Sequence, residues 1–255
     1  MMTAALAGCA GSDITQEDVD AAREEGRAAG IAEATPVSTL DTIIDRGSMK
    51  CGVKESQYGM GYLDAGTGVR SGLDISYCRA VAAALGLNPD TDVEYIHASG
   101  SDRFEKLGNG IIDVLIRTTT WTASRDAGLN ADYAGINFYD GQGIMIRSDF
   151  ISAEAAENSI YALDGANICV GIGTTSEGNL QDWSSSSGVS FTPVYVGSSS
   201  EADSEFINGG CDAISGDSSF LVARKWQMDN DGSLGDVDIW IGQELLSKEP
   251  LAAVT

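Results

Sequence analysis

The sequence predicts an α/β protein with two similar lobes, each built on a mainly parallel sheet. Segments typical of strands and of helices alternate through both halves of the chain, which favours parallel sheets covered by helices. The halves also resemble each other, because NGIIDVLI at 109–116 and NGGCDAIS at 208–215 both place a glycine helix stop before a short strand. Both strands run directly into polar residues, and open α/β sheets bind ligands at the carboxyl ends of their strands.

The first half begins with a helix predicted over 38–47. Ser38 or Thr39 suits its start, Leu40, Ile43 and Ile44 follow at helical spacing, and a glycine ends it. The other elements expected here are strands over 49–53, 93–97 and 112–116, a Gly/Tyr-rich loop over 54–72, a helix from Asp74 and a short helix near 102–110.

The second half repeats this plan after an extended, glycine-punctuated segment at 135–147. We expect that segment to be a strand crossing from one lobe to the other. The remaining elements are strands over 166–173, 191–196, 211–215 and 246–255, with helices over 174–183, 200–210 and 218–226.

The charge of the chain excludes several classes of partner. Among 255 residues, 15 Lys and Arg stand against 38 Asp and Glu, so the net charge is −23. Such a field repels nucleic acid and anionic membranes, and we exclude both as partners. One histidine, His97, argues against histidine catalysis or a multi-histidine metal site. The acidic stretch at 229–238 lacks the glycine and glutamate of a calcium loop, so we expect neither a metal nor a cofactor.

Residues 1–37 are predicted to lie outside any core. Leu6-Ala7-Gly8-Cys9 resembles a bacterial lipoprotein processing site, in which Cys9 would carry the lipid. The charged and apolar regions that precede such a site are absent, so either the signal is truncated or the match is chance. Residues 13–37 are acidic and rich in Ala and Gly, which predicts a tether outside the core, part of which could be helical.

Four cysteines remain when Cys9 is set aside, and four allow three disulfide connectivities. Pairing neighbours gives Cys51–Cys78 and Cys169–Cys211, one bridge in each half. Such bridges persist in oxidising compartments such as the periplasm. The alternative is four buried free thiols in a reduced cytoplasm.

The stretch IRTTTWTASRD at 116–126 is the first candidate site. Arg125 suits a carboxylate, because its guanidinium donates two parallel hydrogen bonds. Thr118, Thr120 and Thr122 alternate, so in an extended chain their hydroxyls would point to one side. The alternative is that Thr122 or Ser124 caps a helix.

Two further candidates lie in the second half. GIGTTSEG at 171–178 is a glycine-rich turn before a helix, which exposes backbone N–H groups to an anion, but it lacks the dinucleotide fingerprint and the Walker lysine. Asp217 follows the strand at 211–215, where it could hold an ammonium group or cap the next helix. Two sites suited to a carboxylate and one suited to an ammonium group together match an α-amino acid. Tyr58, Met60 and Tyr62 would pack against the ligand or only within their own loop.

These motifs together resemble a known family. KCGV, GLDISYCRAVAAALG, RFEKLGNGIIDVLIRTTTWTASRD, NFYDGQGIMIR, ICVGIGTTSEGNL, GCDAISGDSS and SKEPLAAV occur in the order found in periplasmic amino-acid-binding proteins of ABC importers, solute-binding protein family 3. The chain is most similar to the general L-amino-acid-binding branch, over about 38–255.

The resemblance implies a two-lobed periplasmic-binding-protein fold of type II, with mainly parallel sheets joined by hinge strands. Lobe 1 would span 38–140 and lobe 2 141–248, with hinge strands around 139–143 and 249–254. The strand over 249–255 would start the return to lobe 1. Family members continue beyond this strand, so we expect the C-terminal part to be missing.

The resemblance also implies roles for single residues. Arg125 would take the ligand α-carboxylate, helped by Thr120 and by the backbone around Thr175, while Thr118 and Asp217 would hold the α-ammonium. The loop from Tyr58 to Tyr62 would cover the ligand side chain. The expected ligand-binding set is Tyr58, Tyr62, Thr118, Thr120, Arg125, Thr174, Thr175 and Asp217.

The function implied is a monomeric, periplasmic receptor that captures L-amino acids with broad specificity and delivers them to an ABC permease. If the processing motif is genuine, Cys9 anchors the receptor to the membrane through its lipid. An enzyme is not expected, because no serine has a neighbouring base to activate it. Two alternatives stay open. One is the sensing domain of a receptor, which should carry a membrane span. The other is a dehydratase or lyase of the same fold, which would need a cleft carboxylate with a perturbed pKa, for which Asp217 is the candidate.

Overall fold

The computed structural model describes residues 15–34, 38–129, 131–152 and 160–255. The described residues fall into two compact units, those up to residue 45 and those from 46 to 255. Cys9 and its processing motif lie outside the described residues. The described helices include none that is both long and apolar enough to cross a membrane.

The first unit contains the helix α1, Gln16–Ala34, and most of α2, Thr39–Arg46. Thr15 and Asp18 cap α1 reciprocally, since each backbone N–H donates to the other side chain. The side chains of 15–27 are exposed. Helix α1 occupies most of the segment at 13–37 that was predicted to be a tether. In α2 only Ile43 of the predicted apolar face is buried, while Leu40 and Ile44 are exposed.

The second unit contains a nine-stranded sheet in the order β5-β1-β6-β12-β7-β10-β8-β9, with β11 paired to β7, among the residues described. Strand β1 is parallel to β5 and β6, and β8 is parallel to β9 and β10, as the alternating pattern predicted. The strands are β1 Met49–Val53, β5 Val93–His97, β6 Val114–Leu115, β7 Tyr133–Arg147, β8 Asn167–Gly171, β9 Thr192–Val196, β10 Ala213–Asp217, β11 Ile239–Ile241 and β12 Ser247–Val254.

Helices cover this sheet. In the first half these are α3 Leu73–Ala84, α4 Arg103–Gly108 and α5 Ala123–Gly128; in the second half they are α7 Thr175–Ser187, α8 Ser199–Ile207, α9 Ser218–Asp231 and the short η1 Ile160–Leu163. Helix α9 continues beyond the predicted end at Trp226, which shortens the acidic turn expected after it.

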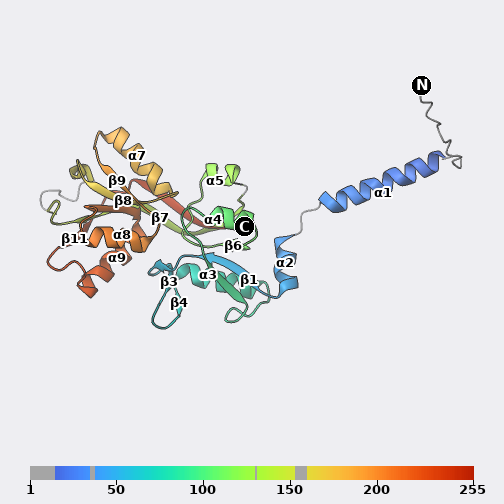
Figure 1. Ribbon diagram of the computed structural model, residues 1–255, viewed down its shortest axis with the longest axis horizontal. Helices are drawn as coiled ribbons and strands as arrows, with labels where there is room; N and C mark the ends of the chain where they lie inside the picture. The colour runs from blue at the N-terminus through green and yellow to red at the C-terminus, as the bar shows by residue number, and fades with distance from the viewer. Residues whose placement is uncertain (1–14, 35–37, 130, 153–159) are drawn as a thin grey trace, which may run out of the picture. The chain divides into compact units, whose positions relative to one another are not determined.

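Strands β7 and β12 form an antiparallel pair in the middle of the sheet, with Gln142 opposite Ser247 and Tyr133 opposite Val254. Strand β7 continues past this pair to bond β10 and β11, so one strand links the two parallel regions, as Figure 1 shows. The crossing strand predicted at 135–147 is confirmed as an extended element. The segments named as hinge strands lie side by side in this pair.

The core of the second half lies on both faces of the sheet. Ile144 and Ile146 of β7 join one buried apolar cluster, whereas Met145 between them joins another. This alternation follows from the two-residue period of a strand. Helix α7 packs near β8 and β10, and α9 packs on β7, β10 and β11. The loops at the ends of β8, β9 and β10 are thereby held in place.

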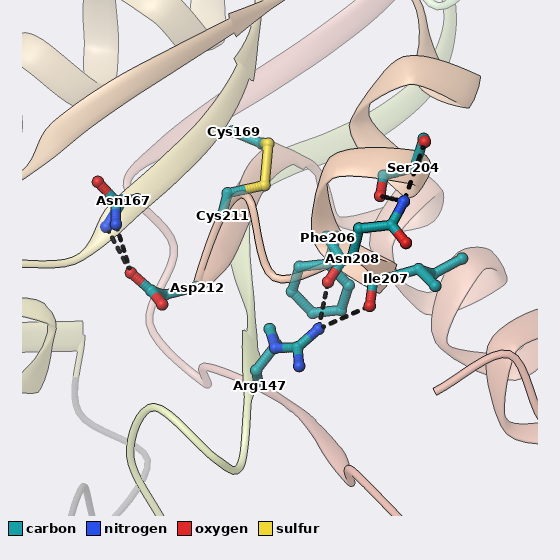
Figure 2. Close-up of a disulfide and its surroundings, with 9 residues drawn as sticks. All are labelled: Arg147, Asn167, Cys169, Ser204, Phe206, Ile207, Asn208, Cys211 and Asp212. Carbon is teal, nitrogen blue, oxygen red and sulfur yellow. Dashed lines mark hydrogen bonds between the residues drawn. A yellow bond between two sulfur atoms is a disulfide. The ribbon is translucent and has the colours of Figure 1, made fainter. Parts of the chain in front are cut away.

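Two disulfides confirm the pairing of neighbouring cysteines and exclude the free thiols. Cys51 of β1 bonds Cys78 of α3, and Cys169 of β8 bonds Cys211 before β10. Figure 2 shows the second bridge among other cross-links: Arg147 donates to the carbonyls of Phe206 and Ile207 at the end of α8. Each bridge ties a strand of the sheet to a neighbouring element.

Four short strands were missed. The segment 54–72, expected as a loop, holds a small antiparallel sheet of β2 Ser56–Gln57, β3 Gly61–Leu63 and β4 Arg70–Ser71. Strand β11 was missed as well. Strands of two or three residues are too short to show a two-residue hydrophobic period, so their sequence offers no signal.

Candidate functional site

A cavity of about 110 Å³ lies among loops of the second unit. Its walls come from both halves of the chain: the segment after β6, the start of α4, and the turns that follow β8, β9 and β10. These turns lie at the carboxyl ends of parallel strands, where ligand binding was expected. The predicted residues that line it are Thr118, Thr120, Thr174, Thr175, Asp217 and Arg125.

The segment after β6 does not have the extended form on which the threonine alternation depended. Thr118 has φ 50°, in the left-handed region that a residue other than glycine adopts at a cost. Thr118 and Thr120 nevertheless both line the cavity. Thr122 instead caps α5, accepting from the backbone N–H of Arg125 at 3.2 Å. Capping and cavity lining are thus divided between different threonines of one segment.

Arg125 is held by its own neighbourhood. Its Nη1 donates to the carbonyl oxygen of Thr120 at 2.9 Å, and its guanidinium lies 5.7 Å from the ring centre of Phe104. The hydroxyl of Tyr133 donates to the same Thr120 carbonyl at 3.1 Å. Burial lowers the pKa of Arg125, with Tyr133 and Glu249 opposing it. An arginine fixed in this way loses less side-chain entropy when a carboxylate binds.

The turn between β8 and α7 is capped at its helix. Thr174 is the N-cap of α7: its hydroxyl accepts from the N–H of Glu177 and donates to the carbonyl of Gly171 at 2.7 Å. The Glu177 carboxylate in turn accepts from the N–H of Gly173 at 2.9 Å. The Thr174 hydroxyl, which was predicted to contact a ligand, therefore stabilises the turn.

Thr175 has a different position. Its hydroxyl oxygen lies 3.3 Å from that of Thr120 and donates to Glu249 of β12 at 2.8 Å. Glu249 is buried and also accepts from Asn179 at 2.9 Å. A hydrogen-bonded chain of side chains thus connects the segment after β6, the start of α7 and β12.

Asp217 occupies the N-cap position of α9, yet its side chain makes no capping hydrogen bond. Its carboxylate lines the cavity. Burial raises the pKa of Asp217 to about 6, while Lys54 lowers it and the carboxylates of Asp140 and Glu249 raise it further. Burial destabilises the ionised form of this carboxylate. A cation beside it, such as the ammonium group expected there, would stabilise that form.

Two arginines of the cavity were missed. Arg103 donates to the carbonyl of Gly100 at 2.5 Å and to that of Gly173 at 3.1 Å. Arg117 is only 7% exposed, and burial lowers its pKa to about 10, opposed by Asp217 and Asp74. In the sequence, Arg103 is one of several charges on a short helix and Arg117 follows a strand, so only the position of Arg117 beside the threonine run could have marked it.

Lys54 and Asp74 act on the same cavity electrostatically. Burial and the charge of Arg117 lower the pKa of Lys54 to about 7, whereas Asp217 and Asp74 raise it. Burial raises the pKa of Asp74 to about 6, against the effect of Lys54 and Arg117. Opposing shifts of this kind are expected where cations and anions lie near one another in a poorly solvated region.

The two tyrosines lie elsewhere. Tyr58 stacks on Trp226 with ring centres 5.6 Å apart, and Tyr62 meets Tyr58 edge-on at 5.4 Å. Tyr58 lines a second, largely apolar hollow together with Tyr139 and Leu245, and Tyr62 lines neither space. The structure therefore does not bring these tyrosines to the cavity that contains Arg125 and Asp217.

Residues 49–229 match the family described as bacterial extracellular solute-binding proteins, family 3. The glutamate/glutamine/aspartate/asparagine-binding protein BztA of Rhodobacter capsulatus is 40% identical over 89% of this chain and 64% of its own length. The general L-amino acid-binding periplasmic protein AapJ of Rhizobium johnstonii is 36% identical over 86% of this chain and 61% of its own. The chain thus spans less than two thirds of these relatives.

Solved structures agree with this. A periplasmic binding protein from Brucella ovis with glutathione bound has 38% identity and a TM-score of 0.77, covering 86% of this chain and 65% of that one. An ancestral arginine-binding protein bound to arginine has 27% identity and a TM-score of 0.68, and the match covers 82% of this chain and 84% of that one. The expected periplasmic-binding-protein architecture is confirmed, and the chain belongs to the bacterial extracellular solute-binding proteins of family 3.

Proposed function

We propose that this protein is a receptor that binds L-amino acids outside the cytoplasm, with broad specificity, and delivers them to the membrane permease of an ABC importer. One observation carries the proposal: a single cavity contains both Arg125 and Asp217. Their charges complement the carboxylate and the ammonium group of an α-amino acid, and charge-assisted hydrogen bonds of this kind are strong. The names of BztA and AapJ, which both specify amino acids, support the same ligand class.

Within this proposal, Arg125 binds the α-carboxylate with help from Thr120 and the backbone at the start of α7 near Thr175. Asp217 and Thr118 hold the α-ammonium. Thr174 contributes by fixing the turn, because its hydroxyl is engaged in capping. Tyr58 and Tyr62 are not carried into this set, since they lie away from the cavity.

Ligand capture is proposed to close two lobes, 38–140 and 141–248, around the paired strands β7 and β12. The support is that both halves contribute to the cavity walls and meet where the Arg103 side chain donates to the Gly173 carbonyl and where the hydroxyls of Thr120 and Thr175 touch. The closed receptor, acting as a monomer, would then present its ligand to the permease. YhdW of Escherichia coli K12, 36% identical, is named a putative amino-acid ABC transporter-binding protein, which favours this partner.

The raised pKa of Asp217 is a property that a dehydratase or lyase of the same fold would also need. In a receptor the same shift follows from burying a carboxylate that awaits an ammonium group. The curated relatives are named as binding proteins, which favours the receptor. Incubation with each amino acid, followed by proton NMR of the ligand, distinguishes the two, because a receptor returns its ligand unchanged.

The proposal is tested by thermal unfolding with each of the twenty L-amino acids, with Arg125→Ala as the control. A ligand present at 100 times its Kd stabilises the folded state by about 2.7 kcal/mol. We expect several amino acids to raise the Tm of the wild type and none to raise that of Arg125→Ala. If no amino acid shifts the wild type, the proposal is wrong.

We also propose that the protein is periplasmic and that Cys9 is its lipid attachment. The motif Leu6-Ala7-Gly8-Cys9 supports the second point, and the periplasmic relative AapJ supports the first. Expression in a bacterial host with an alkyne fatty acid should label the wild type and leave Cys9→Ser unlabelled. Equal labelling of both forms would contradict lipidation at Cys9.

A further inference from the structure

Arg117 is a buried cation whose hydrogen-bond donors are unused. Its side chain lines the cavity and is 7% exposed. Within the described ranges, no hydrogen bond or ion pair reaches the guanidinium, and its buried Nε has no partner. Burying a guanidinium without acceptors is costly, so such a group in a cavity indicates an acceptor supplied from outside the chain.

The nearby carboxylates do not supply that acceptor. Asp217 and Asp74 raise the pKa of Arg117 through space, but neither forms an ion pair with it within 4.0 Å. Glu249 accepts from Thr175 and Asn179. Asp140 likewise bonds the backbone N–H and the hydroxyl of Ser219. These carboxylates lower the positive electrostatic potential of the site, but none of them accepts a hydrogen bond from the guanidinium of Arg117.

The other cations of the cavity are engaged or already assigned. Arg103 donates from both terminal nitrogens, to the carbonyls of Gly100 and Gly173, which leaves only its buried Nε without a partner among the described residues. Lys54 donates to the side chain of Gln57. Arg125 is the proposed partner of the α-carboxylate. Arg117 is therefore left over once an ordinary zwitterionic amino acid has been placed.

The balance of charge in the cavity wall agrees with this. Three arginines line the cavity, at 103, 117 and 125, and Asp217 is the only carboxylate among the described lining residues. A zwitterion adds one charge of each sign and leaves this excess of cations unchanged. A ligand with one more negative charge reduces it, in a poorly solvated site where charge pairs are strong.

We propose that Arg117 binds a second carboxylate of the ligand, so that among amino acids the site prefers L-glutamate or L-aspartate to their amides. This inference rests on the proposed function, because it uses Arg125 and Asp217 to fix the α-carboxylate and α-ammonium. The planar fork of Arg117 suits a carboxylate, which accepts two parallel hydrogen bonds from it.

The test is isothermal titration calorimetry with L-glutamate, L-glutamine, L-aspartate and L-asparagine. Each acid and its amide have nearly the same shape, so their affinity ratio reports the side-chain charge alone. In the wild type we expect at least one acid to bind about tenfold or more tightly than its amide, as for a desolvated charge pair. Comparing the two acids shows which chain length reaches Arg117.

Variants assign the preference to a residue. Arg117→Gln should bring the acid-to-amide ratio close to one, whatever its effect on either affinity, and Arg117→Lys should keep part of it because the charge remains. Arg125→Gln should weaken the acid and the amide together. If Arg117→Gln does not fold, as judged by circular dichroism, the wild-type ratio and Arg117→Lys decide.

The outcomes separate this inference from the proposed function. Equal wild-type affinity for acids and amides, lost in Arg125→Gln, overturns the inference and leaves the receptor intact. The same acid preference in wild type and Arg117→Gln also overturns it, since another group would then bind the second carboxylate. If the wild type binds no amino acid, both proposals fail.

Discussion

The guanidinium of Arg103 donates a hydrogen bond to the carbonyl oxygen of Gly173 at 3.1 Å and so joins the two halves of the chain beside the cavity. The backbones approach closely at the same place. A Cβ on Gly100 would lie 2.7 Å from the carbonyl oxygen of Ile172, nearer than real Cβ atoms come. The side of the cavity between α4 and the β8–α7 turn can thus close only if residue 100 has no side chain.

Gly100→Ala is therefore expected to weaken amino-acid binding. The added methyl group meets backbone rather than a flexible side chain, so the two halves must move apart, at a cost of about 1–3 kcal/mol for overpacking. Calorimetry with the best amino-acid ligand measures the loss. Gly178→Ala is the matched control, because nothing lies within 4 Å of its Cβ and alanine favours a helix. Wild-type affinity in Gly100→Ala would show that this contact does not control binding.

Arg125→Ala should abolish most of the binding of every amino acid. Removing one partner of a buried, charge-assisted pair costs about 2–5 kcal/mol, which lowers affinity on the order of 30-fold or more. Arg125→Lys should recover only part, because lysine lacks the planar fork. Arg79→Ala serves as a surface control, since its ion pair with Asp90 is exposed. Unchanged affinity in Arg125→Ala would remove Arg125 from the site.

Much of the fold could be predicted because long elements have a readable period. The helix from Asp74 was located from its apolar spacing, and the strand at 135–147 from its extended, glycine-punctuated sequence. Short elements such as β2 and β11 could not be found in this way, because their two or three residues carry no period. Their form depends on partners far away in the sequence.

Site residues could be predicted where a suitable residue type occurs at the end of a recognisable strand. Arg125 and Asp217 lie at the ends of recognisable strand–helix units, and the structure places both in one cavity. Arg103 and Arg117 were missed because burial of a charge depends on tertiary packing, which local sequence does not reveal. Tyr58 was assigned from its loop, but stacking on Trp226 of α9, a long-range contact, holds it elsewhere.

Loss of the disulfides should destabilise the protein substantially. Cys169 and Cys211 are 42 positions apart, and closing a loop of that length in the unfolded chain corresponds to about 4 kcal/mol. Cys51 and Cys78, 27 positions apart, should contribute slightly less. Urea unfolding of the two double alanine variants, compared with wild type, measures both effects. A wild-type transition that dithiothreitol leaves unmoved would contradict the prediction, and alkylation with mass spectrometry confirms that reduction occurred.

Amino-acid affinity should fall as the pH drops below about 6. Burial raises the pKa of Asp217 to about 6, and the ligand ammonium requires its ionised form. Binding below this pH must release a proton, so affinity decreases by up to about tenfold per pH unit for each such group. Asp74, also near 6, acts in the same direction. Lys54 gains its proton as the pH falls through about 7, and this added positive charge weakens binding of the ligand's ammonium group and strengthens binding of its carboxylate.

The unliganded protein should show the opposite trend, which separates a binding effect from acid unfolding. The folded pKa of Asp217 lies above its ordinary value of 3.8, so between about pH 6 and 4 the folded state holds more protons than the unfolded state. The contribution of Asp217 to the free energy of unfolding therefore rises as the pH falls through that window. Calorimetry and thermal unfolding from pH 8 to 4.5 should diverge in wild type, and Asp217→Asn should flatten both curves. Parallel loss of affinity and stability in wild type would contradict the assignment of Asp217.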